Sequence, residues 1–439
     1  MERILNIIRL AVIVIIIFLT SLVFAQDAAK ITLGIDGVYT SHEFGNIKHH
    51  SIDIYGSGLM SNFQFQQNNF KIVNRMFMSD TWENAAKGGG KEVKDIFGYT
   101  HEGYIQYANN WGLINNKWTV GRTFPDHGFG KFGQLLISND SRPFDLLSWD
   151  IQYKTITGNM TGIQLENING KKRFLSLHTL NWNYKNKLTV SFSEASLYTG
   201  ENRGIEWQFF NPVIFWVPER ENPSTGMANG FLYGGVKFYH TPSLSFWSEI
   251  VIDDYQINRD TKGDLEPNEI GFIGGVEKTD WPFSSSDLWL EYTRLTNRTY
   301  QTPDLSETFT HRGFPIGHYL GNDFDMVQLY YSQTNLEGKL KPYISLAYLR
   351  DGANGLDTPF DFPWEDSTVT MATGYSEPFP TGPITYVAEM ELAADYKFGS
   401  DSFINAGLFF QRKTLLGQTE NNFSFIIRLW FSLDKTFSY

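Results

Sequence analysis

Residues 423–433, with the sequence FSFIIRLWFSL, decide the fold class of this chain. Their apolar side chains recur at every second position, on one face of an extended chain: Phe423, Phe425, Ile427, Leu429, Phe431 and Leu433. The other face carries Ser424, Arg428 and Ser432, with Ile426 and Trp430 among them. A period of two is that of a β-strand, because helical side chains repeat every ~3.6 residues. The segment therefore predicts a strand with one apolar and one mixed face.

The same alternation recurs along the chain, in residues 188–193, 327–332, 343–348, 384–395 and 404–411. Short polar turns join such runs at residues 183–186, 241–243, 335–337 and 399–401. Longer connections occupy residues 79–97, 199–228, 299–322 and 351–383. Alternating strands of about 10 residues, with short turns at one end and long loops at the other, are typical of outer-membrane barrels.

We therefore predict an all-β fold, a transmembrane antiparallel β-barrel of the outer membrane. The runs number about 16 to 20 and bacterial barrels have even strand numbers, so about 18 strands are expected, with 16 as the alternative. A soluble propeller is disfavoured because no blade-length repeat occurs. A sandwich would also alternate but would not place charges inside. The charges of Glu389, Glu391 and Asp395 suit a wet lumen or a solvent face equally, so the signal peptide and the aromatic end of the chain favour the barrel.

Both ends of the chain agree with export to the outer membrane. Arg3 and Arg9 precede an apolar run from Leu10 to Phe24, and the run ends at Val23-Phe24-Ala25, a signal peptidase site. We predict that residues 1–25 are a signal peptide, with a membrane-spanning anchor as the alternative reading. Residues 26–439 then form a single barrel domain with long extracellular loops. The aromatic end Phe437-Ser438-Tyr439 resembles the signal that barrels present to the barrel assembly machinery.

The composition excludes several classes of protein. The chain has no cysteine, so a lipoprotein anchor, disulfides and thiolate metal sites are excluded. A net charge of −12 disfavours nucleic acid as a partner, because binding to phosphates needs basic patches. The 36 Phe, 22 Tyr and 12 Trp suit a barrel, whose aromatic girdles ring both lipid–water interfaces.

Several short motifs follow one another after residue 100. They are Gly121-Arg122, Gly128-Phe129-Gly130, Ser138-Asn139-Asp140-Ser141-Arg142-Pro143, Phe210-Asn211-Pro212, Asn229-Gly230, Gly234, Trp247-Ser248-Glu249, Asp253-Asp254, Glu291-Tyr292-Thr293, Gly313-Phe314-Pro315-Ile316-Gly317-His318 and Leu320-Gly321-Asn322-Asp323. In this order they resemble the Wzi-type capsule assembly family of outer-membrane proteins. The resemblance implies an 18-stranded barrel whose outer face binds capsular polysaccharide as a surface lectin. Residues before 100 show no family signature, and the helical segment of some members is missing.

Side chains predicted to face the lumen combine carboxylates with aromatic rings. Carboxylates accept hydrogen bonds from sugar hydroxyls, and rings stack on the apolar faces of sugars. Arginines match the carboxylates of anionic sugars in bidentate geometry. The candidate polysaccharide-binding residues are Arg142, Tyr233, Trp247, Glu249, Asp253, Tyr255, Trp289, Glu291, Arg312 and His318. The alternative is an ordinary wall network, with Glu249, Asp253 and Glu291 paired to Arg142, Arg294 or Arg312.

No catalytic residue, metal site or cofactor is predicted. His127 and Ser138 are candidates for an enzyme by residue type only, without a flanking nucleophile motif. His318, Asp323 and Asp325 lack the second histidine of a typical metal site.

The expected function is therefore that of a non-enzymatic barrel that binds capsular or exopolysaccharide and supports its assembly or attachment. The further expected partners are outer-membrane lipid and lipopolysaccharide. The alternative is a diffusion porin whose acidic lumen favours cations. The glycine-rich segment 128–133 bears on this choice, because folding it inward would plug the pore.

Overall fold

The computed structural model describes residues 29–40, 58–79, 91–93, 96–125, 127–138, 140–216, 228–257, 260–335 and 337–438. The predicted signal peptide lies outside the described residues. In the described part of the chain, no helix is long and apolar enough to cross a membrane.

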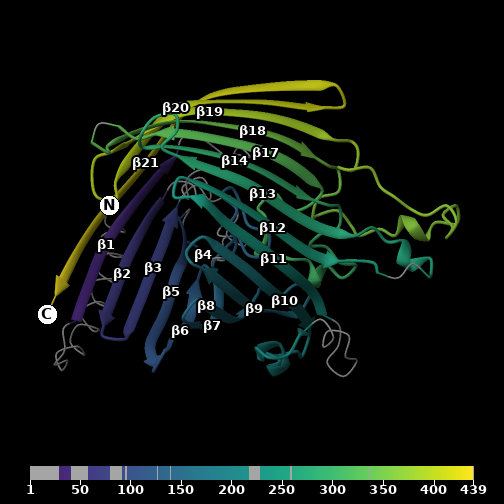
Figure 1. Cartoon of the computed structure of the whole chain (residues 1–439), viewed down its shortest axis with the longest axis horizontal. Coiled ribbons are helices and arrows are strands. Elements are labelled where there is room, and N and C mark those ends of the chain that lie inside the picture. The colour runs from purple at the N-terminus through teal and green to yellow at the C-terminus, as the bar shows by residue number, and fades with distance from the viewer. Residues whose placement is uncertain are drawn as a thin grey trace.

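The chain forms one antiparallel sheet that closes on itself (Figure 1). The last strand pairs with the first, with Lys30 opposite Ser438 and Thr40 opposite Arg428. The short β4 pairs only with β5, and eighteen strands make up the wall. The predicted barrel is therefore confirmed, with 18 strands and not 16.

The strands are β1 (Ala29–Thr40), β2 (Gly58–Gln67), β3 (Phe70–Ser79), β4 (Lys91–Val93), β5 (Ile96–Trp111), β6 (Ile114–Thr123), β7 (Phe144–Tyr153), β8 (Ile156–Gln164), β9 (Lys172–Tyr184), β10 (Leu188–Gly200), β11 (Ala228–Thr241), β12 (Leu244–Asp254), β13 (Glu269–Thr279), β14 (Ser286–Leu295), β17 (Phe324–Gln333), β18 (Leu340–Asp351), β19 (Thr385–Lys397), β20 (Phe403–Leu415) and β21 (Gln418–Ser438). A separate hairpin consists of β15 (Thr310–His311) and β16 (Phe314–Pro315). Single turns of 3-10 helix are η1 (Trp207–Phe210), η2 (Gly263–Leu265), η3 (Leu305–Glu307) and η4 (Pro363–Glu365).

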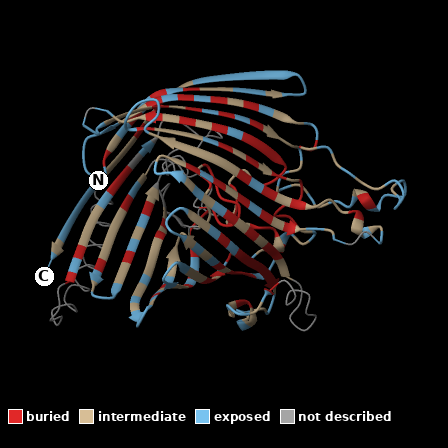
Figure 2. Cartoon of the chain, viewed as in Figure 1, coloured by how far each residue is buried: buried red, intermediate tan, exposed pale blue. Residues whose placement is uncertain are grey.

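Burial alternates along the strands as the sequence predicts (Figure 2). In β21, Leu433 is 69% exposed on the outer face, whereas Arg428 is 1% exposed inside the barrel. Arg428 donates to Glu391 Oε1 at 2.7 Å and to Asn405 Oδ1 at 3.0 Å. Exposed apolar side chains on the outer face of the strands are the inverse of the surface of a soluble protein, and they match a wall that faces lipid.

Connections differ in length at the two ends of the barrel. At one end, here called the turn end, strands are joined by residues 68–69, 112–113, 154–155 and 242–243. At the other, the loop end, the connections include residues 124–143, 201–227, 255–268, 296–323 and 352–384. The three long loops predicted after β10, β14 and β18 are confirmed. The long connections 124–143 and 255–268 were not predicted.

One loop folds back over the outside of the wall. In β10, Glu194 and Tyr198 share the face of the exposed Val190 and Phe192, since all four are even-numbered positions of one strand. Both are nevertheless buried, because residues 201–216, here called the apron, cover them. Glu194 Oε2 accepts from His178 Nε2 at 2.8 Å and from Trp216 N at 3.1 Å.

The apron replaces lipid against the part of β8–β10 that carries polar side chains. Its own outward surface is apolar, with Trp207 80% and Val213 84% exposed. The apron thus keeps the hydrogen-bonded Glu194 and His178 of the outer wall away from lipid, where an uncovered polar side chain would be costly.

Candidate functional site

Residues 127–138, here called the plug, fold into the lumen. Leu135, Leu136 and Ile137 are fully buried in an apolar cluster with wall residues of β7 to β14 and β17 to β19. The glycines of the plug permit tight backbone packing. A Cβ at Gly130 would lie 2.0 Å from the carbonyl oxygen of Gly133. The glycine-rich segment therefore folds inward, as expected of a segment that would plug the pore.

Two carboxylates of the wall hold the plug by its backbone. Glu249 of β12 accepts from the backbone N–H groups of Phe129, Gly130 at 2.7 Å and Leu135 at 3.3 Å. Glu291 of β14 accepts from the N–H groups of Lys131 at 2.8 Å and Phe132 at 3.1 Å. Trp247 Nε1 adds a third hydrogen bond to Glu291, at 2.7 Å. Both carboxylates are buried, and their negative charges are met by amide dipoles of the plug.

These partners differ from the arginines expected for a wall network. Arg294 lies on the outer face of β14, 3.7 Å from the ring of Phe379, because its position has the opposite parity to that of Glu291. Lys131 is the cation nearest to this part of the wall. Its Nζ lies 3.0 Å from Glu277 Oε1 and 4.5 Å from the centre of the Trp289 ring.

A second segment, residues 296–323, crosses the barrel and is here called the bridge. It leaves β14 and reaches β9, five strands away along the wall, where Arg173 donates to the carbonyl oxygens of Ser306, Thr308 and Thr310 at 2.5, 2.6 and 3.0 Å. The backbone of the bridge also binds the plug, since Ser138 N donates to Ile316 O at 2.8 Å.

The plug and the bridge share one apolar core that reaches from β7 to β19. A polar cavity of about 230 Å³ lies on the turn side of the plug, with His127, Thr179 and Asn183 among its lining residues. A diffusion pore needs a polar, water-filled lumen along its whole length. Along β7 to β19, the described residues instead fill the lumen with apolar side chains at the level of the plug.

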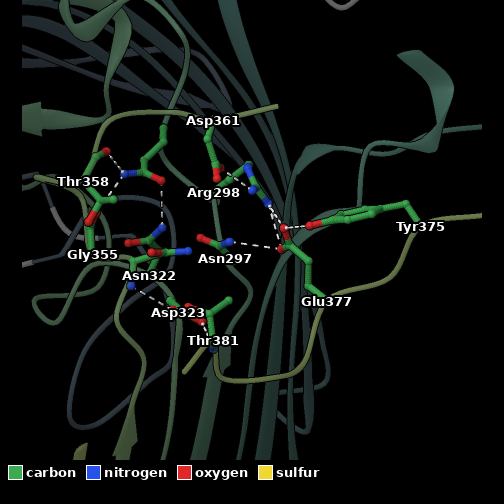
Figure 3. A network of polar contacts seen from close by, with 12 residues as sticks. Asn297, Arg298, Asn322, Asp323, Gly355, Thr358, Asp361, Tyr375, Glu377 and Thr381 are labelled. Carbon is green, nitrogen blue, oxygen red and sulfur yellow. Dashed lines mark hydrogen bonds and ion pairs between the residues drawn. The ribbon is translucent and has the colours of Figure 1, made fainter. Parts of the chain in front are cut away.

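Above the bridge, a polar network ties it to loop 352–384 (Figure 3). Arg298 Nη1 donates to both oxygens of Glu377 at 2.7 Å, and Arg298 Nη2 donates to Asp361 Oδ1 at 2.5 Å. The guanidinium also lies 4.9 Å from the ring of Trp364. Asp323, at the end of the bridge, accepts from Thr381 N at 3.0 Å. Two long loops therefore form one rigid cover at the loop end.

Loop 255–268 joins this cover through η2 and η4, where Lys262 Nζ donates to Glu365 O at 2.8 Å and to Asp366 O at 2.5 Å. Burial, together with the charges of Asp254 and Glu365, raises the pKa of Glu266 to about 7, against an opposing effect of Arg298. A carboxyl whose pKa is raised in the folded loop binds its proton more tightly there than in the unfolded chain. Stability of the packed loop therefore falls as the pH rises through the interval from about 4.5 to about 7.

We accordingly expect amide exchange in residues 260–266 to be better protected at pH 5 than at pH 8, after correction for intrinsic rates. Glu266→Gln should remove this difference and leave the loop protected at pH 8. Glu420→Gln, on the exposed β20–β21 hairpin, serves as the matched control and should leave the difference unchanged. Equal protection at both pH values in the parent chain would contradict the expectation.

The candidate residues from the sequence fall into three places. The largest group lies around the plug and the bridge and consists of Tyr233, Trp247, Glu249, Asp253, Trp289, Glu291 and His318. Within this group, Asp253 Oδ2 accepts a hydrogen bond from Tyr300 N of the bridge at 2.6 Å. Arg142 and Arg312 lie at the loop end, Arg312 beside Asp145 and Arg142 over the ring of Phe314. Tyr255 does not face the lumen, which corrects the prediction. β12 ends at Asp254 after a register shift, so Tyr255 leaves the wall and is 53% exposed.

Sequence reasoning missed Arg173, Arg298 and Glu377, which hold the loops together. Arg298 and Glu377 lie in irregular loops, which have no periodicity, so the ion pair between them could not be predicted from the sequence. Asp325 pairs with Arg350 on the outer wall at 2.8 and 2.5 Å, apart from His318. Among the described residues, no group of three or more His, Asp or Glu side chains is placed to hold a metal ion.

Comparison with known proteins supports the architecture. A solved structure of Wzi from Escherichia coli, described as an outer-membrane protein involved in group 1 capsule assembly and a carbohydrate-binding β-barrel, superposes with a TM-score of 0.63. The sequence identity is 12%, over 91% of this chain and 84% of that chain. OccD3 (OpdP) of Pseudomonas aeruginosa superposes with a TM-score of 0.50 and 10% identity, over 92% and 91% of the two chains. At such identities these likenesses concern the fold.

Comparison with curated protein sequences gives no match. The sequence of residues 97–422, however, matches the family described as capsule assembly protein Wzi. The match covers most of the chain and includes the plug, the bridge and loop 352–384. With its closed 18-stranded wall, this chain belongs to the Wzi capsule assembly family of outer-membrane barrels.

Proposed function

We propose that this protein is a non-enzymatic outer-membrane barrel that binds surface polysaccharide at its loop end and supports capsule or exopolysaccharide assembly. The observation that carries the proposal is the single apolar core shared by the plug and the bridge. A barrel closed in this way has no use as a diffusion porin, and its function falls to the outward surface of its loops. Family membership and the carbohydrate-binding relative support the same conclusion.

The loop end offers the side chains that saccharides need. Tyr255 and Phe362 are exposed aromatic residues, and they belong to two loops that touch through η2 and η4. Their rings can stack on sugar faces, and the neighbouring loop carboxylates can accept hydrogen bonds from hydroxyls. The candidates around the plug, such as Glu249 and Glu291, act indirectly by holding this surface in place.

Three further parts of the proposal concern partners and chemistry. The apolar exterior fits the lipid and lipopolysaccharide of the outer membrane. The aromatic end of the chain fits recognition by the barrel assembly machinery. The positions of His127 and Ser138, the two residues considered for an enzyme, give no support for catalysis. Ser138 Oγ accepts from Asp140 N at 3.2 Å, whereas His127 Nδ1 lies 3.5 Å from Thr179 Oγ1.

The test is a binding titration of the purified, folded barrel in detergent with the extracellular polysaccharide of the producing strain. Dextran serves as the unrelated polymer.

The double variant Tyr255→Ala, Phe362→Ala should weaken binding about tenfold, because two stacking contacts are lost. Tyr396→Ala, Phe398→Ala removes two similarly exposed rings at the turn end and is the matched control. Absence of saccharide binding by folded protein, or steady ion conductance in a planar bilayer, would overturn the proposal.

A further inference from the structure

Three arginines meet at the loop end, each delivered by a different segment. Arg122 is near the end of β6, Arg142 follows the plug, and Arg312 is at the tip of the β15–β16 hairpin. Arg312 and Gly313 both have positive φ, 52° and 75°, as a tight hairpin turn requires. The turn carries Arg312 across the barrel from β14 to the wall at β7. We call Arg122, Arg142 and Arg312 the arginine rim.

One carboxylate, Asp145, lies beside two side chains of the rim, those of Arg122 and Arg312. Arg122 binds it in bidentate fashion, with Nε–Oδ1 2.8 Å and Nη2–Oδ2 2.6 Å. Arg312 Nη2 lies farther away, 3.8 Å from Oδ2. The guanidinium of Arg142 packs over the ring of Phe314, 4.3 Å from its centre. Asp145 therefore faces the guanidinium groups of Arg122 and Arg312, and Arg142 lies beside the hairpin that carries Arg312.

The nearby Glu166 does not correct this imbalance, because other groups occupy it. Arg173 Nη1 lies 3.1 Å from its Oε1, and His311 Nδ1 lies 2.6 Å from its Oε2. The backbone N–H of Arg312 also donates to Oε1, at 2.7 Å. Glu166 thus fixes the hairpin by its backbone and leaves the guanidinium of Arg312 to the rim.

The environment of Arg312 shows that positive charge is in excess. Burial lowers the pKa of its guanidinium, and the charges of Arg122 and Arg142 lower it further, against the effect of Asp145. Among the described residues, Nη1 of Arg312 is buried and has no hydrogen-bond partner. A buried donor on a charged group is costly to leave unpaired, so this position favours an added anion.

The rim is open to solvent at one side. The side chain of Asp145 is 48% exposed, and those of Arg122 and Arg312 are 19% and 13% exposed. An anionic group that approaches from the loop end can therefore reach both arginines beside Asp145. Guanidinium groups match the planar carboxylate in bidentate geometry.

We propose that the arginine rim binds the carboxylate of an acidic sugar residue in the surface polysaccharide. This rests on the proposed function and names the class of saccharide: a polymer that carries uronic or similarly acidic units. The carboxylate completes the coordination of Arg312 and relieves the repulsion among the three arginines.

The experiment measures the affinity of the folded, detergent-solubilised barrel for oligogalacturonates and for the same oligomers after reduction of their carboxyl groups. Arg312→Gln keeps the backbone bond to Glu166 and should weaken binding of the acidic oligomer about tenfold. Asp145→Asn removes the competing carboxylate and should tighten binding about threefold. Arg412→Gln, an exposed arginine on the β20–β21 hairpin, is the matched control and should change nothing. Folding of each variant is checked by the heat-dependent shift of barrels on gels.

The outcomes separate the two proposals. Preference for the acidic oligomer that falls with Arg312→Gln and rises with Asp145→Asn supports the rim. Equal binding of acidic and reduced oligomers in all variants overturns the rim and leaves polysaccharide binding intact. No binding of any saccharide, including the producing strain's own polymer, overturns both. Binding of purified lipopolysaccharide that depends on Arg312, without binding of oligogalacturonate, assigns the rim to lipid phosphate and overturns the acidic-sugar assignment.

Discussion

Replacing Glu249 and Glu291 by alanine is expected to turn a non-conducting barrel into one that passes ions. The two carboxylates accept five backbone hydrogen bonds from the plug. Charge-assisted bonds contribute about 1.5–3 kcal/mol each, and breaking such buried networks costs about 3–5 kcal/mol or more. Openings of the plug should then become about 10²–10³-fold more frequent. Single-channel recording and amide exchange of residues 129–135 measure this directly.

The control is a double variant that removes two other lumen carboxylates. Glu389→Ala, Asp395→Ala takes away acceptors of Gln411 at 2.6 Å and Asn405 at 2.8 Å, both on the wall. This control variant should show no single-channel conductance in the bilayer, and its plug amides should remain protected from exchange. Steady conductance of the parent chain, or unchanged exchange in the Glu249 and Glu291 variant, would show that the plug does not seal the barrel.

The second large effect is expected at Arg298. Arg298→Met should detach loop 352–384 from the bridge, because Glu377 would remain almost buried without its partner. Loss of one member of such a pair costs about 3–5 kcal/mol of local stability. Asp361 is 65% exposed and can regain water, so most of the penalty falls on Glu377. Protease cleavage within loop 352–384 should accelerate about 10²-fold.

The double variant Arg298→Met, Glu377→Met distinguishes charge burial from loss of packing. It leaves no unpaired buried charge, and apolar side chains of similar volume often replace such a pair at little cost. Cleavage should return toward the rate of the parent chain. If the single variant is cleaved no faster than the parent chain, the network of Figure 3 contributes little to holding the loops.

Much of the wall could be predicted from the sequence because strand alternation is a local property. Each residue of β21 or β19 shows its face by its parity, without knowledge of its neighbours. The same parity predicts that Glu249 and Glu291 point inward. It also rules out Arg294 as a lumen partner for them, which the alternative of a wall network had overlooked. Parity gave the wrong position for Tyr255, because β12 ends one residue earlier, at Asp254, after a register shift.

The partners of these inward side chains required the tertiary structure. Glu249 meets Phe129 and Gly130, which are more than a hundred residues away in the sequence. Arg173 meets the bridge across the barrel, and Arg312 reaches Asp145 by the same crossing. Loops have no periodicity, so their course depends on which distant wall groups can satisfy their backbone hydrogen bonds.

By itself, the sequence determined an exported, closed outer-membrane barrel with an even number of strands near 18. Strand alternation and turn residues depend only on neighbouring positions in the sequence, so the strands and their turns can be predicted without knowing the tertiary structure. Only the tertiary structure decided that the plug and the bridge share an apolar core in the lumen, that the apron lies outside the wall, and that three arginines converge at the loop end. These features depend on contacts between segments that the closure of the sheet brings together, because closure sets which strands face one another across the lumen.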